Sequence, residues 1–192
     1  MASHNEIEIK FPVADVRALN RRLRKSGFRL VTRRTHEMNT LYDLPGQLLR
    51  GRGELLRLRK YGPAWVLTHK AKGKAGRHKT RAENETTIAD GASMEAILHA
   101  LGFSPTFRYE KFRAEWSDGK GHVVVDETPI GNFGEIEGPA RWIDRTARLL
   151  QIPPSNYITA TYTSLFFQWK QQTGSPANEM TFGAIHTKTR RR

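Results

Sequence analysis

The chain has 192 residues, enough for one domain or for two small halves that share a core. It contains no cysteine, which excludes a disulfide scaffold, thiol catalysis and any zinc site with cysteine ligands. Lys and Arg (32 residues) outnumber Asp and Glu (19 residues), so the formal net charge is +13. This charge favours an anionic partner: a nucleic acid, a membrane surface or a phosphorylated small molecule.

Neither a long apolar run nor a signal-peptide pattern is present. A membrane-spanning helix would need about 18 consecutive apolar residues, and the chain opens without a hydrophobic targeting segment. We therefore expect a cytoplasmic protein with no membrane partner. Part of the positive charge lies at residues 188–192 and on a predicted helix at residues 16–25, where it is typical of a solvated surface.

The first predicted strand, residues 6–10, alternates charged and β-branched residues with a period of two. Glu6, Glu8 and Lys10 therefore share one face, and the isoleucines share the other. Taken alone, this pattern is most simply a half-buried strand with its charges in water. The alternative is that two carboxylates and an amine line a polar cavity, which is the start of a divalent-metal site.

The rest of the chain divides into strands with period-two patterns and helices with apolar stripes. Asp15 and Asp90 are suited to cap two helices, which Gly27 and Gly102 end. The predicted strands are 6–10, 28–42, 54–60, 64–70, 80–88, 106–116, 122–126 and 133–137. The predicted helices are 16–25, 91–101, 142–150 and 157–171. We expect a domain over residues 1–172 and a basic, loosely ordered C-terminal tail over 173–192.

A weak internal repeat indicates how the strands are assembled. A Glu-x-Glu strand, a helix, a Gly-Phe pair and an extended segment occur twice, beginning at Glu6 and at Glu83. Eight strands joined mostly by hairpins are enough to close a barrel, which leaves no exposed edge. We therefore predict an α+β fold: an eight-stranded antiparallel β-barrel, or tunnel, with helices packed outside and pseudo-duplicated halves.

Charged residues lie on one face of these strands and apolar residues on the other. If the apolar faces contact the helices, the charged faces line the barrel interior. A dry interior of this kind would cost too much in desolvation, whereas a wet one could hold a polyanion with divalent metal. Arg suits bidentate phosphate contacts and Lys acts as a point charge, so carboxylates beside them imply a bridging Mg²⁺ or Mn²⁺. The bases are Lys10, Arg57, Arg59, Lys70, Arg81, Lys111 and Arg113, and the carboxylates are Glu6, Glu8, Glu83, Glu85, Asp126, Glu135 and Glu137.

As a set, these motifs resemble the CYTH family, also called the triphosphate tunnel metalloenzymes. That family includes the class IV adenylyl cyclases and the thiamine triphosphatases. The resemblance covers residues 5–170. The matching stretches are Glu6–Lys10, Leu41–Asp43, Leu56–Arg59, Leu67–Lys70, Arg81–Glu85, Glu110–Arg113, Val125–Asp126, Gly131–Glu137 and Thr161–Leu165.

The resemblance implies roles for the charged residues. The seven bases would bind the triphosphate, the seven carboxylates would hold metal directly or through water, and Glu6, Glu8 and Lys10 are the catalytic candidates. Tyr162 either packs its ring on the barrel or closes one tunnel mouth with its hydroxyl near the substrate. Thr161 stands where the family often has Ser.

Two reactions fit such a site. In a cyclase, the ribose 3′-hydroxyl of ATP attacks the α-phosphorus and pyrophosphate leaves. In a triphosphatase, water attacks the terminal phosphorus of inorganic triphosphate, thiamine triphosphate or a nucleoside triphosphate. Both require metal and bases that stabilise the departing phosphates. The resemblance favours the cyclase, with the triphosphatase as the alternative.

Two non-enzymatic functions are weighed against these. A non-catalytic polyphosphate binder would keep the bases and could keep the metal. A nucleic-acid-binding module would explain the charge of +13 but not the carboxylates at alternating strand positions. We therefore expect a small-molecule triphosphate as partner, no specific nucleic acid, and a monomer or homodimer.

Overall fold

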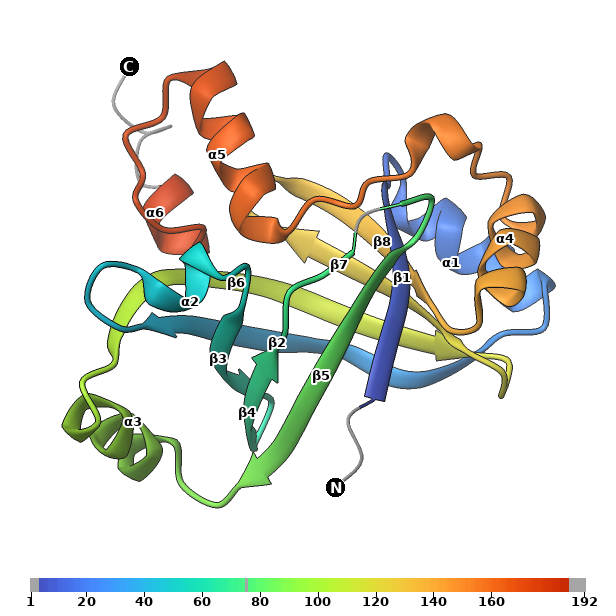
Figure 1. Ribbon diagram of the computed structural model, residues 1–192. Coiled ribbons are helices and arrows are strands. Elements are labelled where there is room, and N and C mark those ends of the chain that lie inside the picture. The colour runs from blue at the N-terminus through green and yellow to red at the C-terminus, as the bar shows by residue number, and fades with distance from the viewer. Residues whose placement is uncertain (1–3, 75, 187–192) are drawn as a thin grey trace.

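The computed structural model describes residues 4–74 and 76–186 (Figure 1). Within them, eight antiparallel strands close a barrel in the order β1-β5-β4-β3-β2-β6-β7-β8, which confirms the predicted fold. The strands are β1 (His4–Pro12), β2 (Arg29–Asp43), β3 (Leu55–Tyr61), β4 (Ala64–Lys70), β5 (Lys79–Ile88), β6 (Ser104–Ser117), β7 (His122–Thr128) and β8 (Gly131–Glu137). The helices are α1 (Val16–Lys25), α2 (Leu48–Gly51), α3 (Gly91–Ala100), α4 (Ala140–Leu149), the 3₁₀ helix η1 (Pro154–Asn156), α5 (Tyr162–Thr173) and α6 (Phe182–His186).

The strand order reflects the internal repeat. Each half contributes a strand, a helix and three further strands: β1-α1-β2-β3-β4 and then β5-α3-β6-β7-β8. The two halves interleave: β5 lies between β1 and β4 of the first half, and β1 lies between β5 and β8 of the second half. On the other side of the barrel, the long strands β2 and β6 pair with each other. The pairing between β1 and β8 completes the ring.

The main hydrophobic core lies outside the barrel. Ile9 and Ile136 project outward from neighbouring strands and are fully buried. They belong to one cluster with Leu23 of α1 and Ile143 of α4, and Figure 1 shows these two helices side by side against this part of the sheet. The alternation of apolar and charged residues therefore places the apolar face under the helices and the charged face inside, as predicted.

Helix ends follow the predicted capping residues. The Asp15 carboxylate accepts a hydrogen bond from the Ala18 amide at 3.0 Å, and the Asp90 carboxylate accepts one from the Ser93 amide at 2.9 Å. Gly102 follows α3 with a φ of 85°, a left-handed conformation that glycine adopts without strain. Among the described residues, no helix combines the length and the apolar character needed to cross a membrane.

One end of the barrel interior is apolar and is closed by α5. Leu41 of β2 and Phe107 of β6 lie on the inward faces of these strands, beyond the charged positions. Phe166 of α5 packs on them and is fully buried, with its ring centroid 5.3 Å from that of Phe107. Figure 1 shows α5 and α6 together over this part of the barrel. The interior is therefore a cup with a hydrophobic base and a charged wall.

The C-terminal region differs from its prediction in two ways. The predicted helix at 157–171 begins later, at Tyr162, because Ile158 pairs its backbone with that of Lys10 and Thr161 caps the helix. Residues after 173 were expected to be loosely held, but Met180 is fully buried and bonds through its backbone to Arg108 and Glu110 of β6. The basic residues 188–192 lie outside the described residues.

Candidate active site: a charged lumen

The barrel encloses a cavity of about 760 Å³, within the range of small-molecule sites. Every predicted site residue except Asp126 lines it, and Asp126 lies directly behind its bases. The structure thus brings together side chains that are spread over more than 150 residues of sequence. The predicted residues that line it are Glu6, Glu8, Lys10, Arg57, Arg59, Lys70, Arg81, Glu83, Glu85, Lys111, Arg113, Glu135, Glu137 and Tyr162.

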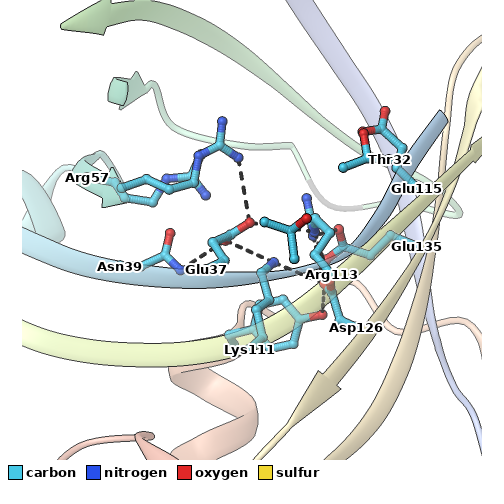
Figure 2. Close-up of polar contacts among 12 residues, drawn as sticks. Thr32, Glu37, Asn39, Arg57, Lys111, Arg113, Glu115, Asp126 and Glu135 are labelled. Atoms are coloured by element: carbon cyan, nitrogen blue, oxygen red, sulfur yellow. Dashed lines mark hydrogen bonds and ion pairs between the residues drawn. The ribbon is translucent and has the colours of Figure 1, made fainter. Parts of the chain in front are cut away.

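One side of the cavity, which we call the paired wall, consists of Lys10, Lys111, Arg113, Asp126 and Glu135. Figure 2 shows the last four of these residues together. Antiparallel register sets it up, because Arg113 lies opposite Asp126 and Lys10 lies opposite Glu135. Arg113 binds both oxygens of Asp126, at 2.8 and 2.7 Å, and also reaches Glu135. Lys10 donates to Glu135 as well. These charges fix the bases in position.

Electrostatics on the paired wall follows from this crowding. Burial alone would raise the pKa of Glu135, but the charges of Lys10 and Arg113 outweigh it and hold that pKa well below its usual range. Burial alone would lower the pKa of Lys10, and the Glu135 carboxylate reverses this into a raised pKa. Both groups are therefore charged at neutral pH.

The Asp126 carboxylate accepts hydrogen bonds from Lys111, Arg113 and Tyr162. Its Oδ2 accepts hydrogen bonds from Lys111 Nζ at 3.0 Å and from the Tyr162 hydroxyl at 2.6 Å, in addition to Arg113. These bonds place Asp126 where it positions the bases, and the predicted contact of Asp126 with metal, direct or through water, stays a prediction. The Tyr162 ring also lies 4.5 Å from Lys10 Nζ and 4.7 Å from Lys111 Nζ.

The opposite side of the cavity carries the two arginines of β3. Arg57 donates to Thr68 at 3.2 Å, and Arg59 donates to Glu85 at 3.2 Å. Glu85 in turn accepts from Thr68 at 2.9 Å. Within the described residues, the Nε–H groups of both arginines are buried without a hydrogen-bond partner. Such donors are suited to an oxyanion, because an unmet buried N–H costs free energy.

The third region, which we call the carboxylate wall, consists of Glu6, Glu8 and Glu137. Glu8 lies directly opposite Glu137 in the pairing of β1 with β8. Glu6 is bound by Lys70 at 2.6 Å and Glu8 by Lys79 at 2.8 Å, whereas Glu137 forms no ion pair with any residue that the structure describes. Burial, followed by the charges of Glu6, Glu135 and Glu8, raises the pKa of Glu137 to about 7. A cation would relieve this repulsion.

Arg81 differs from the other predicted phosphate ligands. Its guanidinium donates to three backbone carbonyls: Ala71, Gly53 at 3.1 Å and Lys70 at 3.1 Å. These bonds hold the ends of β3 and β4 to β5. Arg81 still lines the cavity, but most of its donors serve the backbone.

Three residues that the sequence prediction missed belong to the site. Glu37 of β2 is fully buried among the bases, 3.4 Å from Lys111 Nζ, and accepts a hydrogen bond from Asn39 at 2.9 Å. Lys79 contacts Glu8, as described above. Glu37 and Asn39 continue the inward alternation of β2, and that signal was obscured by the uneven polar pattern of residues 28–42.

Comparison with known proteins agrees with this geometry. The family model described as the CYTH domain matches residues 4–159, most of the chain. The chain belongs to the CYTH family. Its sequence is 26% identical over 147 residues to a Methanocaldococcus jannaschii protein named "putative adenylate cyclase", covering 76% of this chain and 83% of that protein.

Solved structures share the fold of this CYTH protein. A Vibrio parahaemolyticus protein described as a "putative adenylate cyclase" superposes with a TM-score of 0.76 at 20% identity, covering 86% of this chain and 99% of that one. A Hippeastrum protein described as a "putative adenylyl cyclase" with dominant triphosphatase activity superposes with a TM-score of 0.62 at 17% identity, covering 85% and 95%.

Membership of the CYTH family implies a divalent metal, and the carboxylate wall has suitable ligands for one. Oxygen ligands from carboxylates are those that Mg²⁺ and Mn²⁺ prefer, and the raised pKa of Glu137 marks a place where negative charge lacks a counterion. Among the described residues, no three acidic or histidine side chains already converge in a metal-binding arrangement. Lys70 and Lys79 instead form ion pairs with Glu6 and Glu8.

Proposed function

We propose that this CYTH protein is a divalent-metal-dependent enzyme that acts on a triphosphate in the barrel lumen, with ATP cyclisation to cyclic AMP and pyrophosphate as its reaction. One observation carries the proposal: a cavity of about 760 Å³ is lined by bases on two sides and by the carboxylate wall on a third. Bases alone would suit any anion. Bases facing a group of carboxylates suit an anion that arrives with a divalent cation.

Two groups of basic residues would bind the phosphates. The Nε–H groups of Arg57 and Arg59, which have no hydrogen-bond partner in the part of the chain that the structure describes, can donate to phosphate oxygens. Lys111 and Arg113 present their remaining donors from the paired wall, where Asp126 fixes them. Fixed cations of this kind stabilise negative charge that develops on a departing phosphate without having to reorganise.

The carboxylate wall is the part that would hold Mg²⁺ or Mn²⁺, through Glu6, Glu8 and Glu137. The metal supplies charge neutralisation and makes a hydroxyl or water more acidic. Lys70 and Lys79, which occupy Glu6 and Glu8, would then turn to the phosphates. Glu83, Glu85 and Glu135 each contact bases and are placed to orient them or to act through water.

Triphosphate hydrolysis is the second candidate. The residues described above recognise phosphates and metal, and recognition of a nucleoside is not required for any of their contacts. In that reaction, water replaces the ribose hydroxyl as the nucleophile and orthophosphate is released. The Hippeastrum relative, which has the same fold, is described as having dominant triphosphatase activity.

A single assay panel distinguishes these proposals. Purified protein is incubated with ATP, inorganic triphosphate or thiamine triphosphate, in Mg²⁺ and separately in Mn²⁺. Cyclic AMP with equimolar pyrophosphate is the expected product from ATP, and orthophosphate would instead indicate the hydrolase. Absence of product from all three substrates would overturn the enzyme proposal, and binding without turnover would then identify a polyphosphate binder.

A further inference from the structure

Glu37 is an acid placed where the site needs bases. It lies on β2 with no exposed surface, and Figure 2 shows it between Lys111 and Arg57. Its carboxylate is 3.4 Å from Lys111 Nζ, 3.8 Å from Arg113 Nε and 3.9 Å from Arg59 Nη1. Burial would raise the pKa of Glu37, but these cations hold it far below its usual value, so it is ionised.

The contacts of Glu37 are only partly satisfied. Oε1 accepts from Asn39 at 2.9 Å, whereas Oε2 has no hydrogen-bond partner among the described residues. At 3.8 and 3.9 Å from two guanidinium groups, Oε2 attracts them without taking up their donors. The bases are therefore drawn together. The donors of these bases that do not bind Asp126, Glu135 or Glu85 remain available to another anion.

Metal binding does not explain this arrangement. The nearest charged groups to Glu37 are cations from β3 and β6, which would repel a metal ion. Packing does not require a carboxylate here either, because a buried charge costs free energy that an apolar side chain of similar size would not. The position is best understood through the anions that the bases must bind and then release.

We propose that Glu37 is a resident counter-anion: it holds Lys111, Arg113 and Arg59 together in the lumen and weakens their grip on polyphosphate, so that the product anion can leave. This inference rests on the proposed function, since it assigns a positioning and affinity-setting role within the same site. Incoming phosphate oxygens share these cations with Glu37 and are repelled by it. Binding is consequently weaker than the number of bases would give.

The test measures the affinity for inorganic triphosphate by titration calorimetry in EDTA, where no turnover occurs. Glu37→Gln keeps the shape and removes one charge about 4 Å from the bases, so we expect Kd to fall at least about tenfold. With metal present, kcat and KM should both decrease and inhibition by pyrophosphate should strengthen. A purely structural role predicts the reverse for affinity, namely weaker binding.

Glu115→Gln is the matched control. Glu115 lies two residues beyond Arg113 on β6 and also faces the lumen, but its carboxylate contacts His122 at 2.5 Å and Thr32 at 3.4 Å and, within residues 4–74 and 76–186, no lumen base. Glu115→Gln removes one negative charge, as Glu37→Gln does, but leaves Glu37 and its bases unchanged. We therefore expect Kd to change by less than about twofold. An equal tightening in both variants would show a general charge effect and overturn the specific role of Glu37.

Asn39→Asp keeps the inference testable if Glu37→Gln does not fold. This substitution places a second carboxyl group against Glu37, the hydrogen-bond partner of Asn39, and so adds negative charge to the cluster at constant size. Kd should therefore rise by about tenfold. Unchanged or tighter binding in that variant would contradict the proposal. If the wild-type protein itself does not bind triphosphate, the proposed function fails; if it binds and Glu37→Gln binds no more tightly, only the role of Glu37 fails.

Discussion

The paired wall and the carboxylate wall face the same cavity but balance charge in opposite ways. On the paired wall, the bases Lys10, Lys111 and Arg113 outnumber the acids Asp126 and Glu135, and each acid binds at least two bases. The carboxylate wall has three acids with Lys70 and Lys79 beside them, and Lys70 is shared with Glu83. Ionised Glu37 balances the remaining base of the paired wall, whereas the carboxylate wall keeps a surplus of negative charge that a divalent cation would offset.

The largest expected effect on stability comes from breaking the paired wall. Asp126→Ala leaves Lys111 and Arg113 buried without their main partner, so the free energy of unfolding should fall by about 3–5 kcal/mol. Glu6→Ala is the comparison on the carboxylate wall and should cost about 1 kcal/mol, because Lys70 keeps Glu83 at 2.8 Å. Urea unfolding measures both, and equal losses would show that the two walls do not differ as described.

Glu8→Gln should have the largest effect on activity. The substitution preserves size but removes a carboxylate from the proposed metal ligands, and metal ions contribute several kcal/mol to transition-state stabilisation. We expect kcat to fall at least about a hundredfold while the unfolding midpoint stays close to that of the wild type. Glu127→Gln removes a carboxylate that pairs with Arg34 and does not line the lumen, and it should leave kcat unchanged. A near wild-type rate in Glu8→Gln would remove this residue from the metal site.

Glu137→Gln tests the surplus of negative charge on the carboxylate wall through the pH dependence of stability. The pKa of Glu137 is raised to about 7 in the folded state. Between the pKa of this group in the unfolded chain and pH 7, the folded protein therefore binds a proton that the unfolded chain has lost. Stability from this group is therefore present at low pH and is lost as pH rises to 7. In EDTA, Glu137→Gln should remove that loss and be more stable than the wild type by about 1–3 kcal/mol at pH 8, with little difference at pH 4.5. Denaturant unfolding at the two pH values measures this difference. If the stability of the wild type and of Glu137→Gln changed equally with pH, Glu137 would not be crowded by neighbouring carboxylates.

Period-two alternation predicted the walls well because it depends only on local backbone geometry. Once Ile9 and Ile136 face the helices, Glu8 and Glu135 must face the lumen. The same rule did not identify Glu37, because β2 has irregular pairing between Leu30 and Thr35 that breaks the alternation along the strand. Lys79 was missed because it precedes the strand predicted to begin at residue 80 and lies in β5.

Contacts between distant parts of the chain explain why the C-terminal region differs from its prediction. The residues before α5 are extended because Ile158 pairs with Lys10, nearly 150 residues away. Met180 is ordered against β6 for a similar reason. Nothing in the local composition of these segments indicates their partners. The partial pairing of each lumen charge also depends on register across several strands, so the division into two walls could be seen only in the folded barrel.

The smallest effect is expected at the start of α5, which closes the apolar end of the cup. Thr161 accepts a hydrogen bond from the Ser164 amide at 3.2 Å, and Tyr162 follows it directly into the paired wall. Thr161→Ala should lower the free energy of unfolding by about 1 kcal/mol, whereas Thr161→Ser, which keeps the capping oxygen, should be nearly neutral. Hydrogen exchange provides the sharper measurement, since amides of α5 should lose protection in Thr161→Ala while those of β1 and β8 do not. If the Glu8 region loosened equally, the closed end and the carboxylate wall would be one cooperative unit, and the comparison between the walls would have to include the helix that connects to them.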